Sequence, residues 1–217
     1  MAEPVARLYL MTPLLEDAGA FVPVLQQACA AVEVAAVLAR LAPADERTLV
    51  KRVKMLAPAV QNQDAALMIA VEGEGDLAAI AARGGADGVH VRADLDRVRD
   101  LRERFKGERA IGVDGLRTKD DAMTMGEAGV DYLMFGEPRP EGSLPSLDAV
   151  VERAGWWAEI FETPCVAYAP TLAAVARLGA TNAEFIALRD CVWSHADGPA
   201  EAVRLASAAL RQPEAAR

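Results

Sequence analysis

The sequence predicts a single (β/α)8 barrel, the TIM-barrel fold, on two observations. One pattern recurs at 84–91, 128–136 and 178–188: glycines end a helix and lead through a turn into a short apolar strand. These repeats begin about 45 to 50 residues apart, roughly the length of two βα units. The strands are also apolar almost throughout, which is typical of a parallel sheet buried on both faces. An open, doubly wound sheet is the alternative fold.

In the first half of the chain, each apolar run bounded by turn or charged residues is assigned to a strand. The expected strands are 7–11, closed by Thr12 and Pro13, then 32–38, 65–71 and the run that ends at Val91. Helical spacing of apolar residues, or a proline followed by acidic residues, predicts helices at 16–30, from 43 onward, at 76–82 and at 94–105. The first half therefore supplies four βα units.

The second half of the chain repeats this alternation. Strands are expected at 109–113, 131–135, 164–168 and 183–188. Thr118 caps a helix that runs to Glu127, Ser146 caps the next one, and further helices are expected at 171–178 and 198–210. The loop after the sixth strand, 136–142, is the most irregular in the chain. Strands and helices alternate eight times, and a closed barrel leaves none of these strands with a free edge.

Length and composition indicate one domain. The chain has 217 residues, of which 53% are hydrophobic, and this is enough for one sizeable core. An α/β barrel of this length is ordinary. We therefore expect a single barrel domain over residues 1–211 and a frayed C-terminal tail over 212–217.

Charge and cysteine content narrow the environment and the partners. The net charge of −9 argues against nucleic acid or an anionic membrane as a partner, because phosphate groups would be repelled. Glu33 interrupts the longest apolar stretch, so no membrane span is expected, and the first residues lack the features of a signal peptide. Cys29, Cys165 and Cys191 lie far apart and fit reduced thiols better than disulfides. We predict a cytoplasmic protein.

Reactive groups of a (β/α)8 barrel lie just beyond the carboxyl ends of its strands. Charged and polar side chains gather at these positions: Arg40, Glu72, His90, Arg92, Asp114, Glu137, Arg139, Tyr168, Arg189 and Asp190. Guanidinium groups grip carboxylate or phosphate in a bidentate manner, so the cluster predicts a pocket for a small anionic ligand. The alternative is a ring of salt bridges that neutralise one another and cap the barrel.

Two residues of this cluster are candidates for catalytic proton transfer. Glu72 and His90 follow or end strands where a bound substrate would lie, and both side-chain types exchange protons in enzymes. For His90 the alternative is a packed, hydrogen-bonded side chain at the rim of the barrel.

The adjacent residues Trp156 and Trp157 lie in the helix that Ser146 begins. We interpret them as packing residues rather than as a platform for a ligand. Neighbouring positions of a helix do not both face the core, so one of the two tryptophans is available for a contact between two copies of the chain. This pattern predicts a homodimer.

Several of these segments resemble the thiamine phosphate synthase family. The resemblance is carried by Arg-Leu-Tyr-Leu-Met-Thr at 7–12, Gly-Ala-Asp-Gly-Val-His-Val at 85–91, Ile-Gly-Val at 111–113, the run 127–136, Pro-Cys-Val-Ala-Tyr at 164–168 and Gly-Ala at 179–180. It implies a (β/α)8 barrel. In active members it also implies the coupling of hydroxymethylpyrimidine diphosphate to thiazole phosphate, with Mg²⁺ holding the diphosphate.

Compared with that family, the diphosphate and metal positions are altered. Of the Gln-Leu-Arg-Glu-Lys run after the second strand only Arg40 remains, and Ala42 replaces the lysine. Val71 stands where an aspartate binds Mg²⁺, and an alkyl side chain cannot ligate a hard cation. Asp94 reaches the second metal position only if its loop is shifted by one residue. The resemblance therefore leaves no assigned metal site.

The positions that hold the second phosphate in the family are altered as well. A Pro-Thr-x-Thr-Lys loop is replaced by the run 137–141. Ala169 and Pro170 replace a pair of glycines, and proline removes a backbone N–H that would face a phosphate. Asp190 brings a negative charge to the position of a serine. Together these changes predict loss of the parent reaction.

The most consistent hypothesis is a diverged family member that binds a small anionic or phosphorylated molecule at the mouth of the barrel. It needs no cofactor, and Mg²⁺ enters only if the parent activity is retained. One alternative is a working thiamine phosphate synthase. The other is a non-catalytic scaffold whose mouth is closed by salt bridges.

Overall fold

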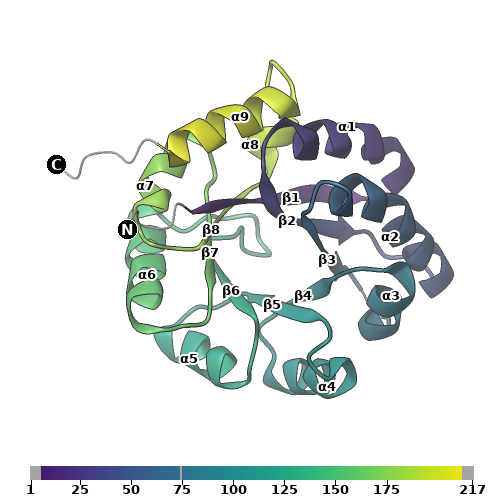
Figure 1. Ribbon diagram of the computed structural model, residues 1–217. Helices are drawn as coiled ribbons and strands as arrows, with labels where there is room; N and C mark the ends of the chain where they lie inside the picture. Colours follow the sequence, from purple (N-terminus) through teal and green to yellow (C-terminus); the bar gives the residue numbers. More distant parts are fainter. Residues whose placement is uncertain (1–5, 74, 212–217) are drawn as a thin grey trace.

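The computed structural model describes residues 6–73 and 75–211, which form a closed barrel of parallel strands (Figure 1). The strands pair in chain order and β8 pairs with β1. They are β1 (Arg7–Leu15), β2 (Val34–Leu41), β3 (Ala66–Val71), β4 (Gly88–Arg92), β5 (Ala110–Asp114), β6 (Tyr132–Phe135), β7 (Cys165–Tyr168) and β8 (Phe185–Leu188). The predicted (β/α)8 barrel is therefore confirmed, and the open sheet is excluded. The predicted tail, 212–217, lies outside the described residues.

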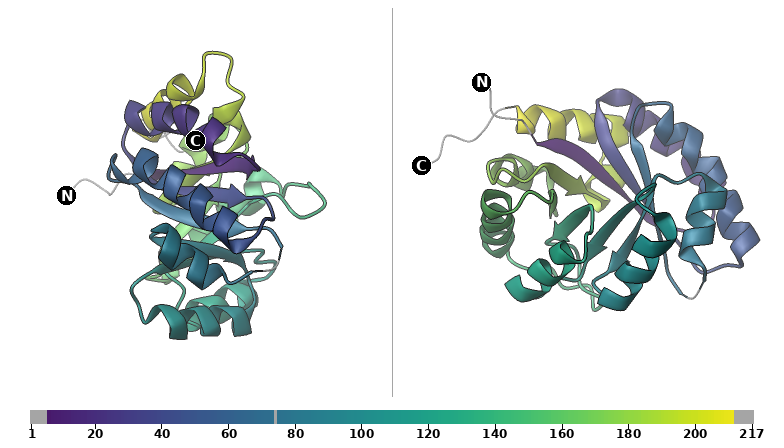
Figure 2. Two further views of the ribbon diagram at one scale, coloured as in Figure 1. Left: turned by 90° about the vertical axis from the view of Figure 1, so that its right-hand side faces the viewer. Right: turned by 60° about the horizontal axis from the view of Figure 1, so that its bottom comes forward.

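Helices surround the barrel on its outer side (Figures 1 and 2). They are α1 (Ala18–Ala31), α2 (Glu46–Gln61), α3 (Leu77–Gly84), α4 (Leu95–Phe105), α5 (Lys119–Glu127), α6 (Leu147–Ile160), α7 (Val175–Gly179), α8 (Asp190–Trp193) and α9 (Pro199–Leu210), with a 3₁₀ turn at Leu172–Ala174. None of them is long and apolar enough to cross a membrane, within the residues described.

Local signals explain where several helices begin and end. The Thr118 side chain accepts the N–H of Asp121, whose carboxylate accepts the N–H of Thr118, so α5 begins with the predicted cap. Ser146 caps α6 as predicted. At the end of α3, Gly85 adopts φ +82°, the left-handed conformation that glycine supplies at low cost.

Two helical segments differ from the prediction. The helix expected at 171–178 is divided into the 3₁₀ turn and α7, which follow one another directly, and Thr171 makes no side-chain cap at their start. The short helix α8 was not expected. It is held by a contact distant in sequence, since the indole N–H of Trp193 donates to the carbonyl of Met11 at 2.6 Å. Local sequence carries no signal for such a contact.

The first strand is longer than predicted, because Thr12 and Pro13 do not end it. They form an irregularity between two paired stretches, and pairing to β2 resumes with Leu14 opposite Arg40. Proline has no N–H to donate to the neighbouring strand. The Thr12 hydroxyl accepts the Arg40 N–H at 3.0 Å, in the place of a backbone carbonyl. This arrangement ties the end of β1 to Arg40, a residue predicted for the site.

The apolar core has two layers, inside and outside the sheet. Large side chains that point inward fill the barrel itself: Tyr9, Met11, Leu38, Met68, Tyr132, Met134, Val166 and Tyr168. The outward-facing side chains pack against the helices in a separate, larger cluster. Because the interior is filled, a ligand can reach the barrel only from its ends.

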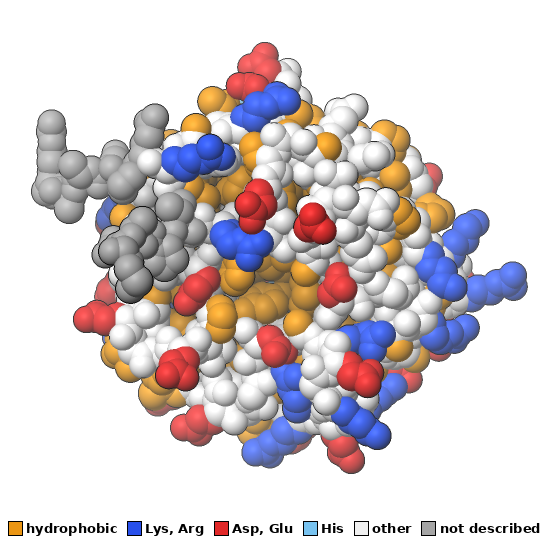
Figure 3. All heavy atoms as spheres, viewed as in Figure 1, with side chains coloured by type: hydrophobic (Ala, Val, Ile, Leu, Met, Phe, Trp, Pro, Cys, Tyr) orange, Lys and Arg blue, Asp and Glu red, His pale blue; other side chains and the backbone are white. Residues whose placement is uncertain are grey.

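The end of the barrel where the strands begin is shown in Figure 3. Acidic and basic side chains are interspersed there around an apolar centre, so neither positive nor negative charge predominates on this face. Two of its ion pairs are Arg7 with Glu33, at 3.2 Å, and Arg102 with Asp131, at 2.5 Å. Exposed ion pairs of this kind contribute little to stability, and active sites of such barrels lie at the opposite end.

The two adjacent tryptophans of α6 differ in burial, as expected for neighbouring positions of a helix. Trp157 is fully buried, stacks on Phe161 at 4.0 Å between ring centroids and donates its indole N–H to the Thr163 carbonyl. Trp156 is partly buried, and the ammonium of Lys119 lies 4.6 Å from its ring. Whether two copies meet at this helix stays a prediction.

Candidate functional site

The carboxyl ends of the strands surround a cavity of about 640 Å³, here called the mouth cavity. The β6–α6 loop projects from the same end of the barrel (Figure 2). Charged side chains that line the cavity come from most of the strand ends: Arg40, Glu72, His90, Arg92, Arg97, Asp114, Glu137, Arg139 and Arg189. Such a cavity is large enough for a small metabolite and is rich in groups that bind anions.

A chain of hydrogen-bonded side chains crosses the barrel beneath this cavity. The hydroxyls of Tyr9 and Tyr132 lie 2.7 Å apart, and the Tyr132 hydroxyl lies 2.9 Å from Nδ1 of His90. On the other side of the imidazole, Nε2 lies 3.5 Å from Oδ2 of Asp114. Burial raises the pKa of both tyrosines, so both hydroxyls keep their protons at neutral pH. The chain therefore links the barrel interior to the floor of the cavity.

This chain ends at Asp114. Its ionised carboxylate only accepts hydrogen bonds, so Nε2 of His90 is the group that can donate to it. At 3.5 Å the contact between Nε2 and Oδ2 is too long for a good hydrogen bond, and both Nε2 and Oδ1 are buried without a partner among the described residues. No described residue satisfies these two polar atoms.

Two carboxyl groups of the mouth cavity have opposite pKa shifts. Burial by itself raises the pKa of Asp114, but His90 and the positive charges of Arg92 and Arg40 outweigh burial and hold this pKa below its ordinary value. For Glu137, burial and then the negative charge of Asp114 raise the pKa to about 7. A pair of carboxyl groups whose pKa values are pushed apart is typical of sites that move protons.

The backbone between β5 and α5 holds Glu137 in place. Its Oε1 accepts the N–H of Gly115 at 2.8 Å. Gly115 has φ +77°, and the guanidinium of Arg92 lies so close that an added Cβ would be 2.9 Å from it. The positive φ favours glycine at 115, and the absence of a side chain leaves room for the guanidinium of Arg92.

Two ion pairs occupy part of the rim. Arg40 donates to Glu72 at 3.2 Å, and Arg189 donates twice to Asp190, at 3.0 and 2.7 Å. Two salt bridges of the kind expected in the alternative prediction, a ring of salt bridges that caps the barrel, are therefore present. They do not close the mouth, because the cavity between these pairs remains open.

Most of the residues predicted for the site line the mouth cavity, but Tyr168 and Asp190 do not. Tyr168 is 3% exposed and lies inside the barrel with Tyr9 and Tyr132, one layer below the cavity. Asp190 begins α8 and is directed to Arg189. Their predicted role in binding a ligand is untested, and their positions give it no support.

Sequence reasoning did not identify Tyr9 and Tyr132 as parts of the site. Both lie in apolar strands, where an aromatic residue is ordinarily core. The available signal was Gly112, a glycine in the middle of a strand, which marks a close approach of another group. An added Cβ there would lie 2.0 Å from Cζ of Tyr132.

The described residues do not fit the Mg²⁺ site that the resemblance implies. Within 6–73 and 75–211, no group of three or more His, Cys, Asp or Glu side chains is arranged to hold a metal ion. Asp94, the predicted alternative ligand, caps α4 by accepting the N–H of Arg97 at 3.0 Å. The Glu72 carboxylate is engaged by Arg40. A hard cation requires several oxygen ligands, and these two are committed elsewhere.

The tyrosine chain makes a prediction about stability. Tyr132→Phe removes one hydroxyl and leaves the buried Tyr9 hydroxyl and His90 Nδ1 without their partner. We expect the free energy of unfolding to fall by about 1 to 3 kcal/mol, measured by urea denaturation. Tyr168→Phe is the matched control, since no hydrogen bond of its hydroxyl is found in the described residues. Equal effects of the two substitutions would contradict the chain.

The chain is similar in sequence to one family of known proteins. The family described as thiamine monophosphate synthase matches residues 8–192. The chain is 38% identical over 199 residues to a thiamine-phosphate synthase of Rhodospirillum centenum (strain ATCC 51521 / SW), covering 91% of this chain and 94% of that protein. It is 34% identical over 209 residues to the thiamine-phosphate synthase of Hyphomonas neptunium (strain ATCC 15444), covering 93% and 92%.

Two solved structures share the fold. One is the thiamine phosphate pyrophosphorylase of Pyrococcus furiosus, with a TM-score of 0.77, 19% identity and coverage of 99% of this chain and 100% of that one. The other is a 3-hexulose-6-phosphate synthase, with a TM-score of 0.68, 17% identity and coverage of 93% and 99%. At this level of identity the likeness concerns the barrel alone.

Proposed function

The chain belongs to the thiamine monophosphate synthase family, and from this premise we propose that it is a diverged member that binds a small anionic or phosphorylated molecule in the mouth cavity. The observation that carries the proposal is the gathering of arginines around an open cavity in a protein of net charge −9. In such a protein a local excess of guanidinium groups selects anions.

Three features of the mouth support divergence from the parent reaction. The carboxylates that the metal would need are engaged, Glu72 by Arg40 and Asp94 at the start of α4. After β7, the N–H of Ala169 donates to the carbonyl of Ala187 at 2.8 Å, and Pro170 has no N–H to offer a phosphate. Losing a single group that stabilises developing charge costs about 3 to 4 kcal/mol in activation free energy.

The cavity also contains groups for proton transfer. Of the two candidates predicted, His90 lies on the floor of the cavity with Nε2 unpartnered, whereas Glu72 is half-exposed in its pair with Arg40. We add Glu137 to them, because a carboxyl group with a pKa of about 7 gives up and takes back a proton near neutral pH. A ligand with a hydrogen-bond donor would satisfy the free Oδ1 of Asp114.

The second candidate function is the parent reaction itself. It is favoured by relatives that are more than 30% identical over most of their length and are called thiamine-phosphate synthases. The assay supplies hydroxymethylpyrimidine diphosphate, thiazole phosphate and Mg²⁺ to the purified protein and measures thiamine phosphate. Our proposal expects no turnover above background, and a rate that depends on enzyme concentration would overturn the divergence.

Binding at the mouth is tested with two arginines in matched ion pairs. Arg40→Ala removes a mouth arginine whose partner Glu72 is 3.2 Å away; Arg7→Ala removes one at the opposite end, also 3.2 Å from its glutamate. With pyrophosphate as probe in a calorimetric titration, we expect Arg40→Ala to weaken binding about tenfold and Arg7→Ala to leave it unchanged. No binding of pyrophosphate by the wild type, or equal losses in both variants, would contradict the proposal.

The remaining expectations concern location and assembly. We propose that the protein works in the cytoplasm without nucleic acid or membrane partners, on the grounds of its acidic charge and three unpaired cysteines. We also propose a homodimer through the outer face of α6, where Ile160 is 60% exposed. Light scattering of the purified protein measures this directly, and a monomer at micromolar concentration would contradict it.

A further inference from the structure

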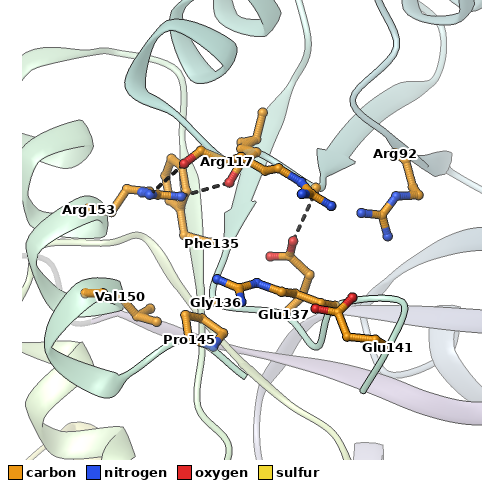
Figure 4. A pocket seen from close by; sticks show the side chains of 13 residues that line it. Arg92, Arg117, Phe135, Gly136, Glu137, Glu141, Pro145, Val150 and Arg153 are labelled. Atoms are coloured by element: carbon orange, nitrogen blue, oxygen red, sulfur yellow. Dashed lines mark hydrogen bonds between the residues drawn. The ribbon is translucent and has the colours of Figure 1, made fainter. Parts of the chain in front are cut away.

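A second cavity lies beside the mouth cavity, here called the side cavity. Its volume is about 340 Å³, and it is bounded by the segment after β5, the β6–α6 loop and the first turns of α6 (Figure 4). Leu116, Phe135, Pro145 and Val150 form the apolar part of its wall. It shares Arg92, Glu137 and Arg139 with the mouth cavity, whereas Arg117 and Arg153 line the side cavity alone. Nothing in the proposed function assigns this space a role.

Four arginines converge on this small volume: Arg92, Arg117, Arg139 and Arg153. Arg153 is fixed by two hydrogen bonds, to the carbonyls of Leu116 at 2.8 Å and Arg117 at 2.9 Å (Figure 4). The other three form no salt bridge with a described residue, although most arginines elsewhere on this surface have an acidic partner. Three guanidinium groups therefore remain available in a protein that has an excess of acidic residues.

The two acidic residues of the wall offset these positive charges only in part. Glu141 accepts the Ser143 hydroxyl at 2.8 Å, and its carboxylate is not within ion-pair distance of a described arginine. Glu137 accepts the N–H of Gly115, and in Figure 4 the guanidinium of Arg92 points toward it. Because the pKa of Glu137 is about 7, its charge is partial at neutral pH. The wall keeps a net positive charge.

We propose that the side cavity is a second anion-binding site, which takes the phosphate group of a small phosphorylated molecule. Planar guanidinium groups bind phosphate oxygens through paired N–H donors. Arg92, Arg117 and Arg139 have such donors available, and Arg153 adds a positive charge held in place by its two carbonyl contacts. The first turn of α6, which contributes Ala149 to the wall, adds the favourable end of a helix dipole. The proposal can be tested separately from the mouth cavity, because Arg117, Ala149 and Arg153 line the side cavity alone, whereas Arg92 and Arg139 line both cavities.

The test uses two substitutions confined to the side cavity. Arg117→Gln removes a free guanidinium from an exposed position. Ala149→Glu places a carboxylate in the wall, and folding is protected because a glutamate three residues after Ser146 completes a capping box for α6. Arg99→Gln, on the exposed face of α4, is the matched control for charge. Arg40→Ala reports on the mouth cavity alone.

Inorganic phosphate is titrated at constant ionic strength and followed by amide NMR signals, which separate the two cavities. Gly136 and Ala149 report on the side cavity, Val71 and Gly73 on the mouth cavity. We expect saturable shifts at Gly136 and Ala149 in the wild type, weakened at least fivefold by Arg117→Gln and by Ala149→Glu, and unchanged by Arg99→Gln and Arg40→Ala.

The inference is overturned if phosphate shifts only the mouth signals, if chloride produces the same shifts, or if both side-cavity variants bind phosphate as the wild type does. Failure of the mouth proposal gives a different result, namely no saturable shift at Val71 and Gly73 with the side-cavity signals still responding.

Discussion

Replacing Gly112 by alanine is expected to lower the free energy of unfolding by about 3 kcal/mol. Gly112 lies in β5 opposite Tyr132 of β6, and its missing side chain leaves the space that the tyrosine ring fills. A Cβ would lie 2.0 Å from Cζ and 2.3 Å from the hydroxyl oxygen of Tyr132. The ring cannot simply swing aside, because its hydroxyl is bonded to Tyr9 and His90. The strands must separate or the hydrogen-bonded chain must break.

The matched control is Gly155→Ala in α6. There an added Cβ meets its nearest atoms, of Thr181, only at 3.9 Å. An alanine in a helix interior costs less conformational entropy than a glycine, so this variant should gain about 0.5 to 1 kcal/mol. Urea denaturation of both variants measures the contrast. If Gly112→Ala were as stable as the wild type, the close packing of the tyrosine ring on β5 would be wrong.

Glu137 is expected to make the protein less stable as the pH rises from about 4.5 to about 7. An acid whose pKa is higher in the folded protein binds extra protons on folding, so the free energy of unfolding decreases through this interval and is constant above it. At about 1.4 kcal/mol per pKa unit, the contribution lost is of the order of 3 kcal/mol. Asp114, whose pKa is lowered, acts in the opposite sense and at lower pH.

Glu137→Gln separates this effect from every other titration, because the amide keeps an oxygen for the Gly115 N–H but has no charge. The variant should equal the wild type at pH 4 and be about 3 kcal/mol more stable at pH 8. Glu159→Gln, on the exposed surface of α6, is expected to change stability by less than about 0.5 kcal/mol at either pH. Urea denaturation curves at the two pH values measure this difference in the free energy of unfolding. A difference between wild type and Glu137→Gln that is independent of pH would contradict a raised pKa.

The fold was largely predictable because its signals are local. Apolar runs place the strands, Thr118 and Ser146 mark helix starts, and Gly85 marks a helix end. Where tertiary contacts decide, local reasoning failed. Thr12 and Pro13 look like the end of a strand, yet Arg40 on the neighbouring strand donates to the Thr12 hydroxyl and the pairing continues.

The rim of the mouth was predictable for the same reason, since strand ends define it. The hydrogen-bonded chain below the mouth cavity and the side cavity beside it were not predictable. The contact of His90 with Tyr132 depends on the register of β4, β5 and β6, which places His90 opposite Gly112 and Gly112 opposite Tyr132. The side cavity depends on how the β6–α6 loop and α6 enclose Arg117, and loop conformation is not encoded in hydrophobic periodicity.

The closure of β8 onto β1 has a consequence for assembly. Every strand of the barrel has a neighbour on both sides, so no row of backbone N–H and C=O groups is left to recruit an additional strand. Within the described residues, another chain therefore meets helix faces and connecting loops rather than a free strand edge, and the folded barrel gives no starting point for sheet extension or for the fibrillar aggregation that follows from it.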